Sequence, residues 1–236
     1  MVVLSFDVWN TLLDIRRLFR RLVETLAEEM GSSAEELEKR VLEVYSEAKR
    51  LRREGAYTPS SAVPESRRLM ARALGIDEEA LYRALAKTFA GIDGRELLFE
   101  DTLPGLERAR SVAEKVVIVG NTLFWPSSYT RIVLDRAGVL RFVDLCVFSD
   151  EVGYMKPDRA IFIEAARRVG APIEELVHVG DSLAEDVGGA LSAGATAILV
   201  RRGSSYRVVP ELRTAIVGSL IEVERAVAEL MRNLSL

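Results

Sequence analysis

The chain has few of the residues that build disulfides or histidine-based sites: its 236 residues include one cysteine and one histidine. A single cysteine excludes an internal disulfide, and Cys146 lies in an apolar run that predicts a buried, inert thiol. The histidine, His178, is flanked by valines in a second apolar run. We therefore interpret it as a packed core residue rather than a general base.

Long hydrophobic runs and an excess of positive charge are missing as well. No stretch approaches the ~18 apolar residues of a membrane span, so we expect no membrane segment. A net charge of −4 argues against a nucleic-acid surface. The first nine residues include Asp7 and no basic start, unlike a signal peptide. We expect a cytoplasmic protein that is a monomer or a homodimer.

The first part of the chain reads as one short strand followed by a helical block. Residues 2–4 are apolar and partly β-branched without helical spacing, which predicts a buried strand. No strand pattern then interrupts the chain until about residue 90. Ser33 with Glu36 three residues later predicts a capping box at one helix start. The expected helices of this block are 17–30, 33–53, 64–75 and 78–90.

From Asp101 onward strands and helices alternate, which predicts a parallel sheet with right-handed crossovers. The expected fold is α/β, with a Rossmann-like parallel sheet core at residues 1–15 and 99–236. An inserted all-helical subdomain is expected at residues 16–98. The further expected strands are 116–119, 144–148, 176–179, 196–200 and 215–217. The further expected helices are 103–114, 129–137, 159–169, 184–193 and 221–233.

Polar side chains follow several of the expected strands. Asp7, Asn121 and Asp181 come at or just after the ends of three strands, and Lys156 follows a fourth strand after a loop. Because the carboxyl ends of parallel strands meet at one edge of a sheet, we expect these groups in one crevice. Two carboxylates repel each other unless a cation joins them, and an oxygen-rich site suits Mg²⁺. Lys156 would add a fixed positive charge for an anionic substrate.

Four segments around these residues resemble, in order, the four motifs of the haloacid dehalogenase superfamily of hydrolases. The run D-V-W-N-T at residues 7–11 is similar to the first motif, and residues 116–121 are similar to the second. G-Y-M-K-P-D at 153–158 resembles the lysine motif, and G-D-S-L-A-E-D at 180–186 resembles the acidic fourth motif. One such motif alone is weak evidence, whereas four in family order are specific. The helical block matches the family's cap, inserted between the first and second motifs.

The resemblance implies a Mg²⁺-dependent phosphohydrolase that acts on a small phosphate monoester through an aspartyl-phosphate intermediate. Asp7 would be the nucleophile, and Lys156 would neutralise charge. The implied metal ligands are Asp7, the backbone carbonyl of Trp9, Asp181 and Asp186. The implied substrate-binding residues are Thr11, Gly120, Asn121, Thr122 and Lys156.

Two departures from the family pattern leave the activity open. Trp9 stands where most phosphatases of the family have a second Asp, and an aromatic residue there is usual in 2-haloacid dehalogenases. Gly120 replaces the Ser or Thr that hydrogen-bonds the transferred group. Retention of Asp181 and Asp186 favours a phosphohydrolase, because dehalogenation needs no metal. The alternatives are a metal-independent 2-haloacid dehalogenase with an ester intermediate on Asp7, and a catalytically impaired protein that binds a phosphate ligand.

Overall fold

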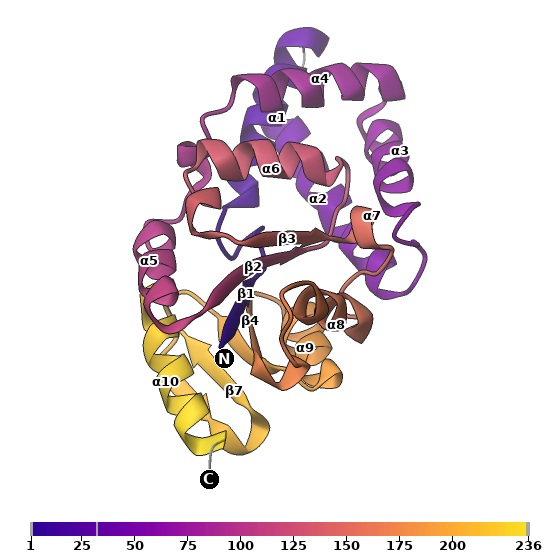
Figure 1. Ribbon diagram of the computed structural model, residues 1–236. Coiled ribbons are helices and arrows are strands. Elements are labelled where there is room, and N and C mark those ends of the chain that lie inside the picture. The colour runs from indigo at the N-terminus through magenta and orange to yellow at the C-terminus, as the bar shows by residue number, and fades with distance from the viewer. Residues whose placement is uncertain (1, 32, 235–236) are drawn as a thin grey trace. The chain divides into compact units, whose positions relative to one another are not determined.

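A seven-stranded sheet carries most of the residues singled out in the sequence. In the computed structural model, which describes residues 2–31 and 33–234, the strand order is β3-β2-β1-β4-β5-β7-β6 (Figure 1). The described strands pair in parallel except β6 and β7, so the α/β Rossmann-like prediction is confirmed. The unexpected antiparallel strand, β6, is short and has no buried residue that would reveal it. The strands are β1 (Val3–Phe6), β2 (Lys115–Gly120), β3 (Leu145–Phe148), β4 (Leu176–Gly180), β5 (Thr196–Val200), β6 (Arg207–Val209) and β7 (Thr214–Val217).

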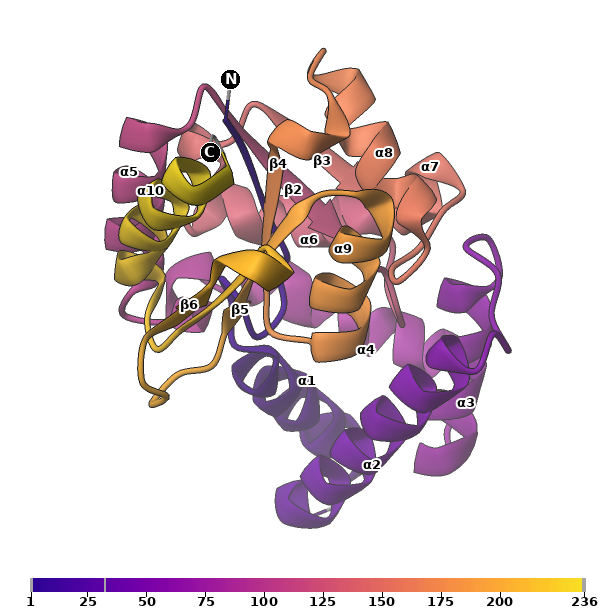
Figure 2. The same ribbon diagram turned by 90° about the horizontal axis from the view of Figure 1, so that it is seen from below.

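Helices cover both faces of this sheet within one compact unit, which comprises Met1–Leu13, Leu98–Asn121 and Gly138–Leu236. Figures 1 and 2 show α5 and α10 side by side on one face, and α8 and α9 on the other. On the second face Ile161 and Phe162 of α8 join Val117 and Val119 of β2 in one buried cluster. The helices of this unit are α5 (Thr102–Val112), α7 (Ser149–Val152), α8 (Arg159–Arg168), α9 (Gly189–Ala193) and α10 (Val223–Leu234), with short turns η2 (Leu140–Phe142), η3 (Ile173–Glu175), η4 (Leu183–Gly188), η5 (Pro210–Leu212) and η6 (Leu220–Glu222).

A second compact unit is helical and comprises Asp14–Leu97 and Thr122–Ala137. The four helices expected in the first of these segments are present. Their core includes an aromatic cluster in which Phe19 packs edge-on against Tyr45 and Trp125, with ring centroids 5.1 and 6.0 Å apart. The elements are α1 (Ile15–Met30), α2 (Ala34–Arg53), α3 (Ala62–Leu74), α4 (Glu78–Gly91), η1 (Gly94–Leu97) and α6 (Ser127–Arg136).

The helix α6 joins the helical unit because it is tied to the end of α4. Arg136 Nη1 donates to the Phe89 carbonyl at 2.6 Å and to the Ile92 carbonyl at 3.1 Å. Gly94 lies so close to α6 that an added Cβ would be 2.3 Å from the Val133 carbonyl oxygen. The helical unit thus includes a segment outside residues 16–98, and the predicted domain limits stay a prediction.

Two local predictions need correction. Ser33 precedes α2 but its side chain makes no capping hydrogen bond, and the Glu36 side chain pairs with Arg40 at 2.6 Å. The helix expected at 184–193 begins as the π-helical turn η4 and becomes α-helical only at α9. The Ser182 carbonyl accepts from the N–H groups of residues 186 and 187, which widens this turn. Across residues 2–31 and 33–234, the helices are too short or too polar to cross a bilayer.

The helix starts give a stability prediction. Asp77→Ala should lower the free energy of unfolding by about 1 kcal/mol, because Asp77 Oδ1 accepts the Ala80 N–H at 2.6 Å at the start of α4. Ser33→Ala should change it by less than about 0.5 kcal/mol, since the Ser33 side chain caps nothing in α2. Urea denaturation of both variants measures the difference, and equal losses would contradict it.

Candidate active site

Three neighbouring strands end in polar residues at one edge of the sheet. β2, β1 and β4 lie side by side, and Asn121, Asp7 and Asp181 follow them directly. The Asp7 N–H still donates to the Val179 carbonyl of β4 at 2.9 Å, so its carboxylate extends from backbone that the sheet holds. The strand order reverses between β1 and β4, and α/β sheets bind ligands at such reversals. The structure thus brings these strand ends together as expected.

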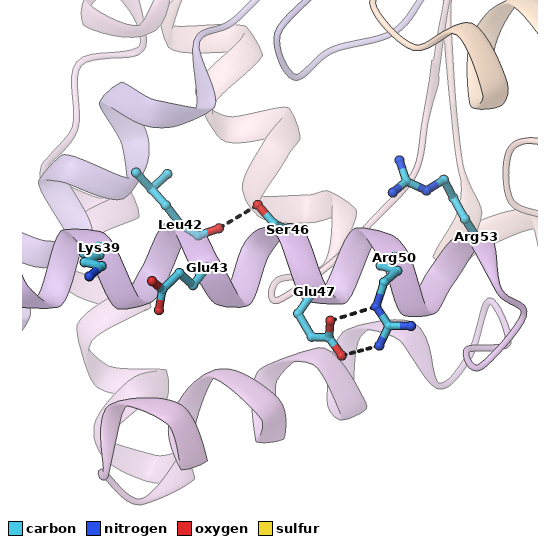
Figure 3. Close-up of a pocket in the computed structure, with 7 residues that line it drawn as sticks. All are labelled: Lys39, Leu42, Glu43, Ser46, Glu47, Arg50 and Arg53. Carbon is cyan, nitrogen blue, oxygen red and sulfur yellow. Dashed lines mark hydrogen bonds and ion pairs between the residues drawn. The ribbon is translucent and has the colours of Figure 1, made fainter.

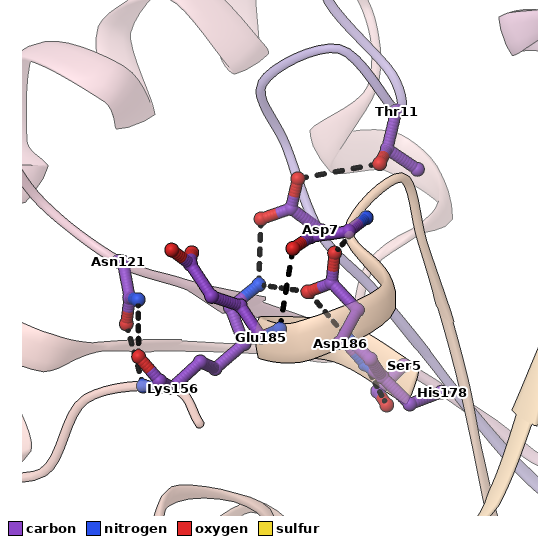
Figure 4. A network of polar contacts seen from close by, with 9 residues as sticks. Ser5, Asp7, Thr11, Asn121, Lys156, His178, Glu185 and Asp186 are labelled. Atoms are coloured by element: carbon purple, nitrogen blue, oxygen red, sulfur yellow. Dashed lines mark hydrogen bonds and ion pairs between the residues drawn. The ribbon is translucent and has the colours of Figure 1, made fainter. Parts of the chain in front are cut away.

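Lys156 joins two carboxylates at this edge. Its Nζ donates to Asp7 Oδ1 at 2.6 Å and to Asp186 Oδ1 at 2.7 Å, and its side chain is 1% exposed (Figure 4). Burial alone would lower the pKa of Lys156, but the charges of Asp186 and Asp7 outweigh it and raise the pKa. The amine therefore stays charged. An ammonium group has three N–H donors, so these two bonds leave a third for an anion.

Asn121 fixes the backbone of Lys156 rather than pointing a free amide at a ligand. Asn121 Nδ2 donates to the Lys156 carbonyl at 2.9 Å, and the Lys156 N–H donates to Asn121 Oδ1 at 2.8 Å (Figure 4). This pair of bonds holds the lysine loop to the end of β2. The predicted role of Asn121 in substrate binding stays a prediction, and its described contacts position Lys156.

A buried chain of hydrogen bonds leads from β1 through β4 to Asp186. Ser5 and His178 are paired across the two strands, and Ser5 Oγ lies 2.8 Å from His178 Nδ1. His178 Nε2 lies 3.1 Å from Asp186 Oδ1, and the Ser182 N–H donates to Asp186 Oδ2 at 2.9 Å. Burial lowers the pKa of His178 although the bond to Asp186 opposes this, so the ring is neutral near pH 7. The prediction that His178 is a core residue is confirmed, but the sequence did not indicate its contact with Asp186.

Three carboxylates form a group that can hold a metal ion. Asp7, Asp181 and Asp186 each offer an oxygen, and these oxygens lie within 4.8 Å of one another. Burial raises the pKa of Asp7; Lys156 works against this rise and the Asp186 carboxylate reinforces it. Burial would also raise the pKa of Asp186, but Lys156 and His178 outweigh it and lower the pKa. In their ionised forms, three carboxylates against one ammonium leave an excess of two negative charges, which fits a divalent cation.

The other predicted site residues have different surroundings. Thr11 is buried and its Oγ1 donates to Asp7 Oδ2 at 3.2 Å. Trp9 lies two residues after Asp7 in the sequence, and the role of its backbone carbonyl as a metal ligand stays a prediction. Thr122 is buried and groups with the helical unit, so its role in substrate binding also stays a prediction. Glu185, which the sequence reasoning passed over, is buried in the same network (Figure 4). Its place one residue before Asp186 is the signal that could have identified it.

Gly120 has no room for the hydroxyl side chain that the family pattern places there. An added Cβ would be 2.8 Å from Phe148 Cε1 and 2.9 Å from Phe148 Cδ1. Phe148 ends β3, the strand next to β2, and its side chain is buried. The missing hydroxyl and the phenylalanine ring are therefore linked, because the ring occupies the space that a side chain at residue 120 needs.

A shallow depression of about 580 Å³ on α2 is a weaker candidate for a site (Figure 3). Its lining residues come from this one helix, and the Glu47 and Arg50 side chains in it pair with each other at 2.6 Å. These charges satisfy one another on an open surface, and the acidic cluster lies in the other compact unit. We therefore assign the chemistry to the sheet edge.

Comparison with known proteins identifies a family. The family model described as haloacid dehalogenase-like hydrolase matches residues 1–194. A glyceraldehyde 3-phosphate phosphatase from Methanopyrus kandleri is 33% identical over 137 residues, which cover 58% of this chain and 58% of that protein. Less than two thirds of that relative is therefore matched.

Solved structures match over nearly the whole chain. A magnesium-bound HAD hydrolase from Bacillus subtilis is 20% identical with a TM-score of 0.74, covering 95% of this chain and 97% of that one. An L-2-haloacid dehalogenase is 22% identical with a TM-score of 0.72, covering 97% and 99%. At this identity the likeness shows the fold alone, and the fold is shared with a dehalogenase.

The contact between Gly120 and Phe148 gives a prediction about packing. Gly120→Ser should lower the free energy of unfolding by about 1–3 kcal/mol, because the new side chain overlaps the Phe148 ring. In a Phe148→Leu background the same substitution should cost less, since the ring atoms that it meets are gone. Urea denaturation of the two single variants and the double variant measures this coupling. Purely additive losses would show that the two positions do not compete for space.

Proposed function

Because the chain belongs to the haloacid dehalogenase-like hydrolases, we propose that it is a Mg²⁺-dependent phosphatase that hydrolyses a small phosphate monoester. The observation that carries this proposal is the group Asp7, Asp181 and Asp186, whose charge exceeds what Lys156 compensates. An excess of negative charge suits a divalent cation and an anionic phosphate held by it. A metal-independent dehalogenase has no use for this excess. The Methanopyrus relative, a phosphatase by name, supports the same reading.

The proposed metal ligands are the carboxylates of Asp7, Asp181 and Asp186 and the backbone carbonyl of Trp9. When bound, Mg²⁺ would neutralise negative charge on the carboxylates and on the phosphate oxygens. Since Lys156 and His178 already donate to Asp186 Oδ1, the oxygen of Asp186 with capacity to spare is Oδ2.

In the proposed reaction the Asp7 carboxylate attacks the phosphorus atom. The Asp7 O–P bond forms, the bond between phosphorus and the ester oxygen breaks, and the alkoxide leaves with the bonding electron pair and takes up a proton. Water then attacks the aspartyl-phosphate, releasing inorganic phosphate and restoring Asp7. Lys156 holds Asp7 Oδ1 and Thr11 holds Asp7 Oδ2, so the carboxylate has a fixed orientation before attack. The third N–H of Lys156 is available to a phosphate oxygen.

A second candidate activity is favoured by Trp9. In a 2-haloacid dehalogenase, Asp7 would displace halide from carbon and form an ester that water hydrolyses, without a metal. An aromatic residue two positions after the nucleophile suits that activity, and a dehalogenase shares the fold. A phosphate-binding protein without turnover is the third possibility. The cytoplasmic location and the monomeric or homodimeric state stay predictions.

The two enzymatic candidates differ in products and in metal dependence. The parent protein should release phosphate from p-nitrophenyl phosphate with Mg²⁺ and lose this activity in EDTA. Asp7→Asn should abolish turnover, because an amide cannot form the intermediate. Phosphate and halide assays on p-nitrophenyl phosphate and 2-chloropropionate measure both activities. Chloride release that persists in EDTA would favour the dehalogenase, and tight phosphate binding without either product would favour the binding protein.

Trp9 gives a prediction about leaving groups. The chain lacks the usual acid at this position, and general acid catalysis typically contributes on the order of 10²–10⁴ in rate. p-Nitrophenolate leaves without a proton, whereas an alkoxide needs one. The parent should therefore hydrolyse p-nitrophenyl phosphate far faster than alkyl phosphates. Trp9→Asp should raise kcat on alkyl phosphates more than on the aryl ester.

Trp9→Asn is the matched control, since it removes the same ring and matches Asp in size without supplying an acid. Steady-state kinetics of both variants on the two ester classes separates lost packing from gained proton transfer. Identical behaviour of the two variants would show that the missing acid does not limit this enzyme.

A further inference from the structure

Arg202, in the C-terminal part of the sheet unit, binds the loop that directly follows Asp7. Arg202 follows β5, the strand beside β4, and lies beyond residues 1–194 matched by the family model. Its Nη1 donates to the Asn10 carbonyl at 3.0 Å, and its Nη2 donates to the Thr11 carbonyl at 2.8 Å. A side chain 191 residues away in sequence thus contacts two successive peptide groups directly after Trp9.

The loop of residues 8–13 needs these contacts because its own backbone cannot satisfy all of its carbonyls. The Val8 carbonyl accepts the N–H groups of Leu12 and Leu13, at 2.8 and 3.0 Å. Asn10 has a positive φ of 66°, which turns the chain between these bonds. The carbonyls of Asn10 and Thr11 point away from this small ring of bonds and are taken by Arg202. Their orientation therefore depends on a guanidinium group outside the loop.

Arg202 is itself held in place on two further sides. Its Nε and Nη2 donate to Asp101 Oδ1 at 3.2 and 2.8 Å, and its Cζ lies 3.6 Å above the centre of the Phe99 ring. Asp101 occupies the residue before α5, yet its carboxylate makes no bond to the start of that helix. It accepts from Arg202 and from the Leu220 N–H instead, at 2.8 Å in the latter case. A residue type that normally caps a helix thus orients the guanidinium group.

We infer that Arg202 is a positioning residue of the active site. It holds the peptide groups of Asn10 and Thr11 so that the preceding Trp9 carbonyl and the Thr11 hydroxyl keep their places beside Asp7. The planar guanidinium reaches both carbonyls and Asp101 Oδ1 through separate nitrogens held in a rigid fork. A lysine ammonium offers one nitrogen on a flexible stem and does not reproduce this geometry. The expected effect of Arg202 on Mg²⁺ binding and turnover rests on the proposed function. The expected effect of Arg202 on the loop of residues 8–13 is independent of that function.

Arg202→Lys tests the fork separately from the charge, because lysine keeps a cation next to Asp101. Without the two carbonyl bonds, the amides of Leu12 and Leu13 should exchange with solvent deuterium about tenfold faster than in the parent. The affinity for Mg²⁺ should fall about 10- to 100-fold by calorimetry, as for other residues that hold metal ligands in place. In kinetics on p-nitrophenyl phosphate at saturating Mg²⁺, kcat should fall while KM changes little.

Arg110→Lys is the matched control. Arg110 also pairs with an aspartate of the sheet unit, Asp144, and both side chains are more exposed than those of Arg202 and Asp101. This pair lies at the other end of the strands, because Asp144 comes just before β3 and accepts the N–H of Val116 near the start of β2. The variant Arg110→Lys should keep the amide exchange rates of Leu12 and Leu13 and the Mg²⁺ affinity of the parent, even if the melting temperature of the variant falls. Unchanged exchange in Arg202→Lys, or equal changes in both variants, would overturn the inference. A parent protein that binds no Mg²⁺ overturns the proposed function instead, since exchange is measured without metal.

Discussion

The ammonium group of Lys156 is almost completely buried, and the arrangement of the candidate active site follows from that constraint. A buried charge is costly unless opposite charges and hydrogen bonds compensate it. Here Asp7 and Asp186 both lie within 2.7 Å of Nζ, and each carboxylate in turn needs further donors. Thr11 supplies one to Asp7, while His178 and the Ser182 N–H supply two to Asp186. Removing the side chain of Asp7, Thr11, Lys156, His178 or Asp186 therefore takes at least one hydrogen bond away from another member of this network.

The sheet provides the rigidity that this network requires. β1 is central and buried along its whole length, so the backbone before Asp7 cannot shift without disturbing two neighbouring strands. Polar residues within the strands extend the network inward, since Ser5 on β1 is paired with His178 on β4. Asn121 binds both backbone groups of Lys156 and so ties the lysine loop to β2. The charged groups are thereby held at a fixed spacing before any ligand binds, which is the condition for efficient electrostatic catalysis.

The structure explains one of the two departures from the family pattern, at Gly120, but not the other, at Trp9. At Gly120 the ring of Phe148 accounts for the missing side chain, so glycine and phenylalanine form one packing solution. At Trp9 the structure offers no carboxylic acid in the position that the family pattern reserves for one. Asp7, Asp181, Asp186 and Lys156 are nevertheless all present. The charged groups are therefore retained, whereas the carboxylic acid that would donate a proton is missing.

The sequence alone determined the α/β class, the helical block and the identity of the four strand-end segments. Apolar runs and helix stops are local signals, and the order of strands and helices implies which strand ends meet. It did not reveal β6, which has no buried residue, or the π-helical turn before α9, in which the Ser182 carbonyl accepts from two N–H groups. The contacts of Asn121 with Lys156, of His178 with Asp186 and of Arg202 with the loop after Asp7 were decided only in the tertiary structure. Each of these contacts forms because strands that are distant in sequence lie side by side, or because a turn folds back on a strand. Residue spacing along a chain carries no information about such distances.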